Sequence, residues 1–183
     1  AGVLAEPCWL SIQLNRFVFS SLLLISRNGQ LVHVMLTPFH LAIQVRDIHE
    51  AREFYGHHMG LPEGRSDDTW IDWNMFGHQV VTHLNPMLGP NGKVQHHLNP
   101  VDAHAVPVPH FGVVMEVSQW KRLASRVRGF VDNFIIEPYV RFEGQPGEQH
   151  TMFFEDPSGN ALEFKAFANI EAELFATTNG QDL

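Results

Sequence analysis

Residues 38–45 read PFHLAIQV, and residues 109–117 read PHFGVVMEV. In each stretch apolar side chains recur at every second position, which predicts a half-buried β-strand. A histidine, His40 in the first stretch and His110 in the second, stands near the strand start on the other face. The chain therefore carries the same kind of strand twice, which indicates a duplicated unit.

A helix is expected directly after each of these strands. Asp47 begins the first helix, with Glu50 three residues later in a capping-box pattern, and Gly60 ends it. Ser118 begins the second helix and Gly129 ends it. The apolar residues at helical spacing are Ile48, Ala51, Phe54, Tyr55 and Met59 in the first helix, and Trp120, Leu123, Ala124 and Val127 in the second.

Further strands complete each half of the repeat. They are expected at 69–76 and 79–84 in the first half, and around 134–142, 150–155 and 160–167 in the second. Such a half leaves one sheet face uncovered, so we expect an α+β fold in which two paired βαβββ modules form a curved mixed sheet around a metal-binding cleft. The predicted boundaries are an N-terminal extension at 1–34, a first module at 35–86, a connecting loop at 87–107, a second module at 108–168 and a C-terminal tail at 169–183.

Composition limits the classes of partner. The 183 residues carry a net charge of −8, which argues against nucleic acid or an anionic membrane as the main partner and favours a small-molecule substrate. The only cysteine is Cys8, so neither a disulfide framework nor a CxxC metal site can form within one chain. A metal would therefore bind to carboxylates and to some of the 12 histidines, and a reducing, cytoplasmic location is expected.

The N-terminal extension and the connecting loop differ from the modules. The apolar run at 17–25 is too short to cross a bilayer, and we expect residues 1–34 to lie upstream of the functional domain, with Met35 as a natural start and a targeting role as the alternative. The loop is rich in proline, glycine and asparagine. Its histidines, His96, His97 and His104, are expected to be solvated rather than to bind a metal.

Three side chains on the faces opposite the apolar strand positions are candidate metal ligands. His40 and His110 occupy matching places in the repeat, and Glu163 lies on the last strand. Two imidazoles and one carboxylate can hold a divalent metal while leaving positions open for substrate, which is a catalytic arrangement. Each residue alone would more often be an ordinary hydrogen-bonded or solvated residue, but the matched positions favour a shared metal site.

His83 is a fourth candidate, on the strand of the first module that corresponds to the Glu163 strand. It lies six residues after Gly77, whereas Glu163 lies four residues after Gly159. The offset of two residues corresponds to about 7 Å along a strand. We therefore expect His83 to act as an acid or base rather than as a ligand, the alternative being a histidine satisfied by backbone groups.

The strand starts quoted above and the closing stretch at 155–164, EDPSGNALEF, resemble the vicinal oxygen chelate superfamily. This superfamily includes glyoxalase I, methylmalonyl-CoA epimerase, fosfomycin-resistance enzymes, bleomycin-resistance proteins and extradiol dioxygenases. The resemblance spans about residues 36–168. Within it, the segments 76–81, FGHQVV, and 144–149, GQPGEQ, look most like the extradiol-type dioxygenases.

The resemblance implies that His40, His110 and Glu163 bind Fe(II), with Mn(II), Zn(II) or Ni(II) as other ions. It implies a homodimeric dioxygenase for a small vicinal diol or catechol-like substrate, and leaves open whether modules pair within one chain or across the dimer. The alternatives are a glyoxalase-like lyase or isomerase, a fosfomycin-type transferase with a non-redox metal, and a metal-free ligand-sequestering protein. The last class does not need three convergent ligands.

The resemblance also bears on catalytic residues. Extradiol enzymes use a non-ligand histidine as acid or base, and His83 falls on the corresponding strand. They tend to place a tyrosine on the strand before the carboxylate strand, where this chain has Phe153. His150 could partly substitute for it. Arg141 is a candidate partner for a substrate carboxylate, the alternatives being a pair with Glu143 or no partner.

Overall fold

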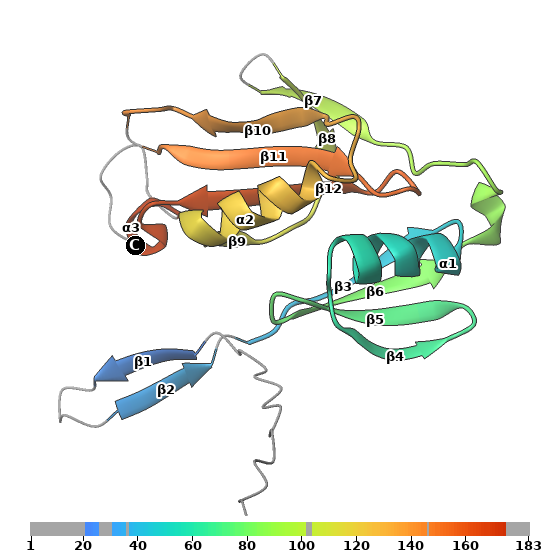
Figure 1. Ribbon diagram of the computed structural model, residues 1–183, viewed down its shortest axis with the longest axis horizontal. Coiled ribbons are helices and arrows are strands. Elements are labelled where there is room, and N and C mark those ends of the chain that lie inside the picture. Colours follow the sequence, from blue (N-terminus) through green and yellow to red (C-terminus); the bar gives the residue numbers. More distant parts are fainter. Residues whose placement is uncertain (1–20, 26–30, 36, 102–103, 146, 175–183) are drawn as a thin grey trace, which may run out of the picture. The chain divides into compact units, whose positions relative to one another are not determined.

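A computed structural model describes residues 21–25, 31–35, 37–101, 104–145 and 147–174. It divides into two compact units, Ala1–Pro38 and Phe39–Leu183. In the first unit β1 (Ser21–Ile25) and β2 (Leu31–Met35) form an antiparallel pair (Figure 1). The predicted extension at 1–34 falls in this unit and lies mostly outside the described residues. The end of the predicted C-terminal tail, in the second unit, also lies outside them.

The first module of the second unit follows the predicted βαβββ order, and its strand β4 lies outside the ranges expected from the sequence. Its sheet has the strand order β3-β6-β5-β4, in which β3 and β6 are parallel and the other pairs are antiparallel (Figure 1). The elements are β3 (His40–Val45), α1 (Ile48–Ala51), the π-helix η1 (Arg52–His58), β4 (Glu63–Asp67), β5 (Trp70–Met75) and β6 (His78–Leu84).

The second module repeats this plan. Its sheet has the order β10-β11-β12-β9, and again only the pair that involves the first strand, β9 with β12, is parallel. The elements are β9 (Val114–Glu116), α2 (Val117–Val127), β10 (Ile136–Arg141), β11 (Gln149–Glu155) and β12 (Ala161–Phe167), followed by α3 (Ile170–Glu173). The predicted α+β fold class is confirmed. None of the helices in the described ranges has the length and apolar composition needed to span a membrane.

The segment expected as a connecting loop contains regular structure. After the short helix η2 (Pro86–Leu88), β7 (His97–Val101) and β8 (His104–Val108) form a two-stranded antiparallel sheet. These strands were not expected from the sequence because each contains a proline, at 100 and at 107, and proline is depleted in strands. A two-stranded sheet consists only of edge strands, where proline is tolerated.

The two main helices begin in different ways. The side chain of Asp47 accepts a hydrogen bond from the backbone N–H of Glu50 at 2.8 Å, so the predicted cap of α1 is confirmed. The Glu50 carboxylate pairs with Arg46 at 2.7 Å instead of closing the capping box. The prediction that Ser118 caps α2 was wrong: β9 ends at Glu116 and the helix starts at the next residue, so Ser118 already lies inside the first turn.

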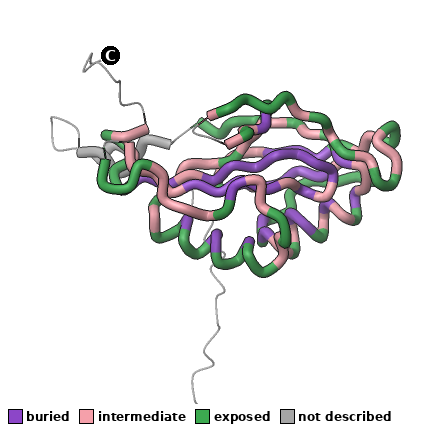
Figure 2. The backbone as a smooth tube through the Cα atoms, turned by 90° about the horizontal axis from the view of Figure 1, so that it is seen from above, coloured by how far each residue is buried: buried purple, intermediate pink, exposed green. Residues whose placement is uncertain are grey.

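The two modules share one hydrophobic core. Phe54 of η1 packs against Phe154 of β11 with ring centroids 6.3 Å apart, and Phe154 stacks on Phe164 of β12 at 5.8 Å. All three side chains are buried. In Figure 2 the buried positions form continuous stretches along neighbouring strands. The helical segment of one module is therefore anchored on the sheet of the other.

The closing loop at 156–160 adds polar contacts between the modules. The buried carboxylate of Asp156 accepts a hydrogen bond from the hydroxyl of Tyr55 at 2.8 Å. The side-chain amide of Asn160 donates to the backbone carbonyl of Gln44 at 2.8 Å. Burial raises the pKa of Asp156, although four hydrogen bonds that the carboxylate accepts counteract it. This loop thus joins the end of one sheet to the helix of the other module.

Candidate functional site

A pocket of about 230 Å³ lies in the second module and its preceding hairpin. Both strands of the β7–β8 hairpin contribute to its wall, as do β10, β11 and β12. Its apolar lining includes Phe153 and Ile136. The polar side chains that line it include His104, His110, Tyr139, Arg141, Glu163 and Lys165. Two of the three predicted metal ligands are therefore in one cavity.

His110 and Glu163 form the centre of this pocket. The Nε2 atom of His110 lies 3.1 Å from Oε2 of Glu163, whose side chain is only 7% exposed. The other oxygen, Oε1, accepts a hydrogen bond from the Thr151 hydroxyl at 3.0 Å and lies 3.2 Å from Nζ of Lys165. Thr151 and Lys165 thus hold one carboxylate oxygen while the second faces the imidazole.

Electrostatics favour the charged forms of both groups. Burial alone would raise the pKa of Glu163, but the hydrogen bond from His110, the positive charge of Lys165 and the Thr151 hydroxyl outweigh it and lower that pKa. The hydrogen bond to Glu163 raises the pKa of His110, burial opposes it, and the Pro107 carbonyl adds to the rise. Both shifts favour a charged pair of His110 and Glu163 over a neutral one.

The two predicted histidine ligands are oriented in the same way. The Nδ1 atom of His110 lies 2.7 Å from the carbonyl oxygen of Pro107, which can only accept, so Nδ1 donates. The Nδ1 atom of His40 likewise donates to Oε1 of Gln79 at 2.7 Å. Metal-binding histidines are typically fixed by such a donated hydrogen bond, which leaves Nε2 for the metal. The donor set of the three residues therefore fits a divalent ion.

His40, however, does not join the pair within one chain. It is exposed on β3, which belongs to the other sheet. In the described part of the chain, Glu53, His57 and His58 are the one group of three potential ligands whose ligand atoms all lie within 4.8 Å of one another. One chain thus brings together two of the three predicted ligands.

Gly112 explains how His110 comes to lie beside Glu163. Phe111 forms an isolated parallel bridge with Leu162, and its carbonyl accepts a hydrogen bond from the backbone N–H of Glu163 at 2.8 Å. A Cβ atom at position 112 would collide with the carbonyl oxygen of Glu163. Only glycine lets the two backbones approach this closely, and the approach carries His110 to the carboxylate.

His83 is exposed on β6 and shares a sheet face with His40. In the parallel register His40 pairs with Gln79, and His83 lies four residues further along the same strand. At about 3.3 Å per residue this separates it from the His40 position by about 13 Å. His83 is not among the residues that line the pocket, so this placement does not support the predicted acid or base role.

His150 lies on the opposite face of β11 from the pocket. Thr151 and Phe153 of the same strand line the cavity, and His150 does not. The ring of His150 instead lies against Trp120 of α2, with ring centroids 5.1 Å apart. Burial and the positive charge of Lys121 lower its pKa. The structure does not bring His150 to the His110–Glu163 pair.

Several pocket residues escaped the sequence analysis. Tyr139 lines the cavity from β10, and its ring lies 5.7 Å from that of His104, a residue expected to be solvated. Arg141, two positions after Tyr139, also lines the pocket, and its pairing with a substrate carboxylate stays a prediction. The alternation along β10 is the signal that could have identified Tyr139.

Comparisons with known proteins bear on the family and the fold of this chain. Residues 37–164 match the family model described as Glyoxalase/Bleomycin resistance protein/Dioxygenase superfamily. A similar crystal structure, a glyoxalase/bleomycin resistance protein/dioxygenase from Alicyclobacillus acidocaldarius, is 31% identical, with 74% of this chain and 94% of that chain covered and a TM-score of 0.58.

A second solved structure agrees in fold alone. The fosfomycin resistance protein FosX from Listeria monocytogenes is 12% identical, with 76% of this chain and 99% of that chain covered and a TM-score of 0.53. No curated protein matches the chain. The family match and the pocket together form the basis for a functional proposal.

Proposed function

Because the chain belongs to the glyoxalase/bleomycin resistance protein/dioxygenase superfamily, we propose that it is a metal-dependent enzyme for a small substrate with two adjacent oxygen atoms. The favoured reaction is an Fe(II)-dependent, extradiol-type dioxygenation of a vicinal diol or catechol-like compound. The observation that carries the proposal is the 3.1 Å approach of His110 Nε2 to Glu163 Oε2 inside a pocket. The other polar atom of each side chain is already hydrogen-bonded, Nδ1 of His110 to the Pro107 carbonyl and Oε1 of Glu163 to the Thr151 hydroxyl.

The third ligand, in this proposal, comes from a second copy of the chain. His40 is exposed, and its donated Nδ1 bond leaves Nε2 available at the surface of β3. A homodimer with two-fold symmetry would place His40 of each copy at the His110–Glu163 pair of the other. This arrangement accounts for both the matched histidine orientations and their separation within one chain.

The remaining pocket residues suit a substrate that carries oxygen anions. A bound metal would lower the pKa of a coordinated substrate hydroxyl. Arg141 and Lys165 bind negatively charged substrate oxygens, while the ring of Phe153 packs against an apolar part of the substrate and excludes water. An imidazole nitrogen of His104, beside Tyr139, accepts the hydroxyl proton in place of His83.

Metal analysis and oxygen uptake test this function together. Protein purified without oxygen is expected to contain about one iron per subunit and to consume oxygen with members of a panel of catechols and aliphatic diols. Zinc or nickel that is bound without oxygen uptake, and that is lost in Glu163→Gln, would support the lyase or isomerase instead. Protein that binds neither iron nor zinc nor nickel in the pocket would contradict the proposal and favour a ligand-sequestering role.

A further inference from the structure

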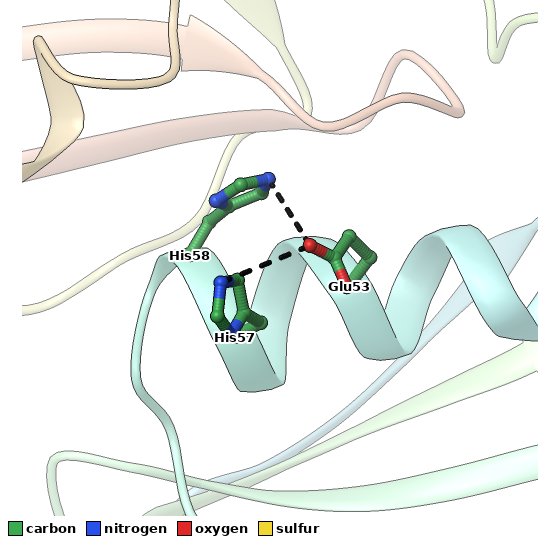
Figure 3. Close-up of side chains that lie close together, drawn as sticks. All are labelled: Glu53, His57 and His58. Carbon is green, nitrogen blue, oxygen red and sulfur yellow. Dashed lines mark ion pairs between the residues drawn. The ribbon is translucent and has the colours of Figure 1, made fainter.

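A second group of potential metal ligands lies on η1, outside the pocket. The Oε1 atom of Glu53 lies 3.6 Å from Nε2 of His58 and 4.0 Å from Nε2 of His57 (Figure 3). All three ligand atoms lie within 4.8 Å of one another. Figure 3 shows both imidazole rings turned toward the same carboxylate from one helical segment.

The π-helical turn makes this convergence possible. In an α-helix the residue at i+4 lies beside residue i, but the residue at i+5 points to another side. In η1 the backbone N–H of Met59 donates to the carbonyl of Phe54 at 2.8 Å, an i to i+5 bond that widens the turn. Both the i+4 and the i+5 residue, His57 and His58, then flank Glu53.

The hydrophobic core holds this wide turn in place. Phe54, Tyr55 and Met59 are all buried. Tyr55 is fixed further by its hydrogen bond to Asp156, and Phe54 by its edge contact with Phe130 at 5.7 Å. The positions of the two histidines therefore follow from packing on the other side of the helix.

The ligand side chains are partly ordered yet open to solvent. The His58 ring stacks on Phe130 with a centroid separation of 5.0 Å and an interplanar angle of 12°, which sets its plane and leaves the nitrogens at the ring edge. The side chains of His57 and Glu53 are 74% and 62% exposed, so an ion and its waters have access. The neighbouring Arg52 binds Glu63 through two hydrogen bonds, which directs its charge away from Glu53.

We propose that Glu53, His57 and His58 form a second divalent metal site that takes a borderline transition ion such as Zn²⁺. Two ligands of one tetrahedral zinc ion lie about 3.3–3.5 Å apart, given bond lengths of about 2.0–2.2 Å. The present separations exceed this by a margin that small rotations of exposed side chains remove. Imidazole and carboxylate together favour Zn²⁺, Ni²⁺ or Cu²⁺ over Mg²⁺ or Ca²⁺, and water completes the coordination.

Zinc titration of the full chain tests this site. With Zn²⁺ as the probe and a chromogenic chelator as competitor, the unchanged protein is expected to bind one equivalent more than Glu53→Gln or His58→Ala. His49→Ala, which removes an exposed histidine from the preceding helix α1, serves as the matched control and is expected to retain the full count. A tenfold excess of Mg²⁺ is expected to leave the count unchanged.

Because the measured quantity is a difference of one equivalent, it is independent of the pocket metal. The same difference arises whether the unchanged protein binds two ions or only this one. Equal zinc counts in the unchanged protein and in Glu53→Gln would overturn the proposal, as would displacement of the extra ion by Mg²⁺. Should His58→Ala fail to fold because it loses its stacking on Phe130, Glu53→Gln changes only an exposed side chain and still decides the question.

Discussion

At the scale of single residues, the two oxygens of the Glu163 carboxylate have different environments. Oε1 is held by Thr151 and Lys165, whereas Oε2 faces the imidazole of His110. A divalent ion placed between Oε2 and Nε2 would displace the shared proton, because the ligand histidine must be neutral to bind metal. The same two atoms therefore either form the ion pair or bind the metal.

Glu163→Gln is expected to reduce metal affinity by at least the ten- to hundredfold loss that is typical of outer-shell changes, while the protein remains folded. Loss of the carboxylate also removes the main cause of the raised pKa of His110, which should fall. Metal content after dialysis and an NMR titration of His110 measure the two effects. Glu155→Gln, on the neighbouring strand β11, is the control; unchanged metal content in Glu163→Gln would remove this residue from the site.

His150 offers a pH-dependent prediction outside the pocket. Burial and Lys121 lower its pKa below the unfolded value of about 6.5. The native state thus binds this proton less readily than the unfolded state, so the stabilising contribution is present above about pH 6.5 and is lost as the pH falls through the folded pKa. Urea unfolding from pH 8 to pH 5 should show a shallower decline in His150→Gln. A steeper decline would contradict the assignment.

At the scale of elements, the closing loop at 156–160 links modules that are otherwise joined by apolar packing. Asp156 is 2% exposed, and its carboxylate accepts a hydrogen bond from the hydroxyl of Tyr55 in η1. The same helical segment carries Glu53, His57 and His58 on its outer side. The π-helix η1 therefore packs into the core with one face and carries potential metal ligands on the other.

Tyr55→Phe tests the contribution of the Tyr55–Asp156 hydrogen bond to stability without creating a large cavity. It leaves the buried Asp156 carboxylate with one donor fewer, and a lost partner of a buried polar group costs about 1–3 kcal/mol. Chemical denaturation should show this loss in the free energy of unfolding. Tyr139→Phe, a change of the same kind in the pocket wall, should cost less. Equal effects would show that the Tyr55 hydroxyl has no special role.

At the scale of the whole molecule, the separation of His40 from the His110–Glu163 pair leads to a mixing experiment. If each metal site spans two copies, His40→Ala and His110→Ala homodimers both lack intact sites. After unfolding and refolding together in equal amounts, half of the dimers are mixed, and each mixed dimer contains one intact site, so about one quarter of the original metal binding should return.

Measured metal content per chain, compared with each variant refolded alone, gives the result directly. Recovery near one quarter would support a site shared between copies. No recovery, with metal binding retained in His40→Ala alone, would restrict the ligands to one chain and remove His40 from the proposal.

The duplicated βαβββ pattern, the fold class and the strand faces of His40 and Glu163 could all be read from the sequence, whereas His110, expected on a strand, lies before β9, which begins at Val114. These features follow from local rules, because side chains alternate along a strand with a period of two whatever the rest of the chain does. The family resemblance rests on the same local stretches and is confirmed by the match at residues 37–164.

Tertiary structure alone decided which side chains meet. The pairing of His110 with Glu163 depends on a close backbone approach at Gly112, and the exclusion of His40 depends on how two sheets pack around a common core. The grouping of His57 and His58 around Glu53 depends on a π-helical turn held by buried residues. Such contacts join parts of the chain through packing, and packing is a property of the assembled core rather than of any sequence window.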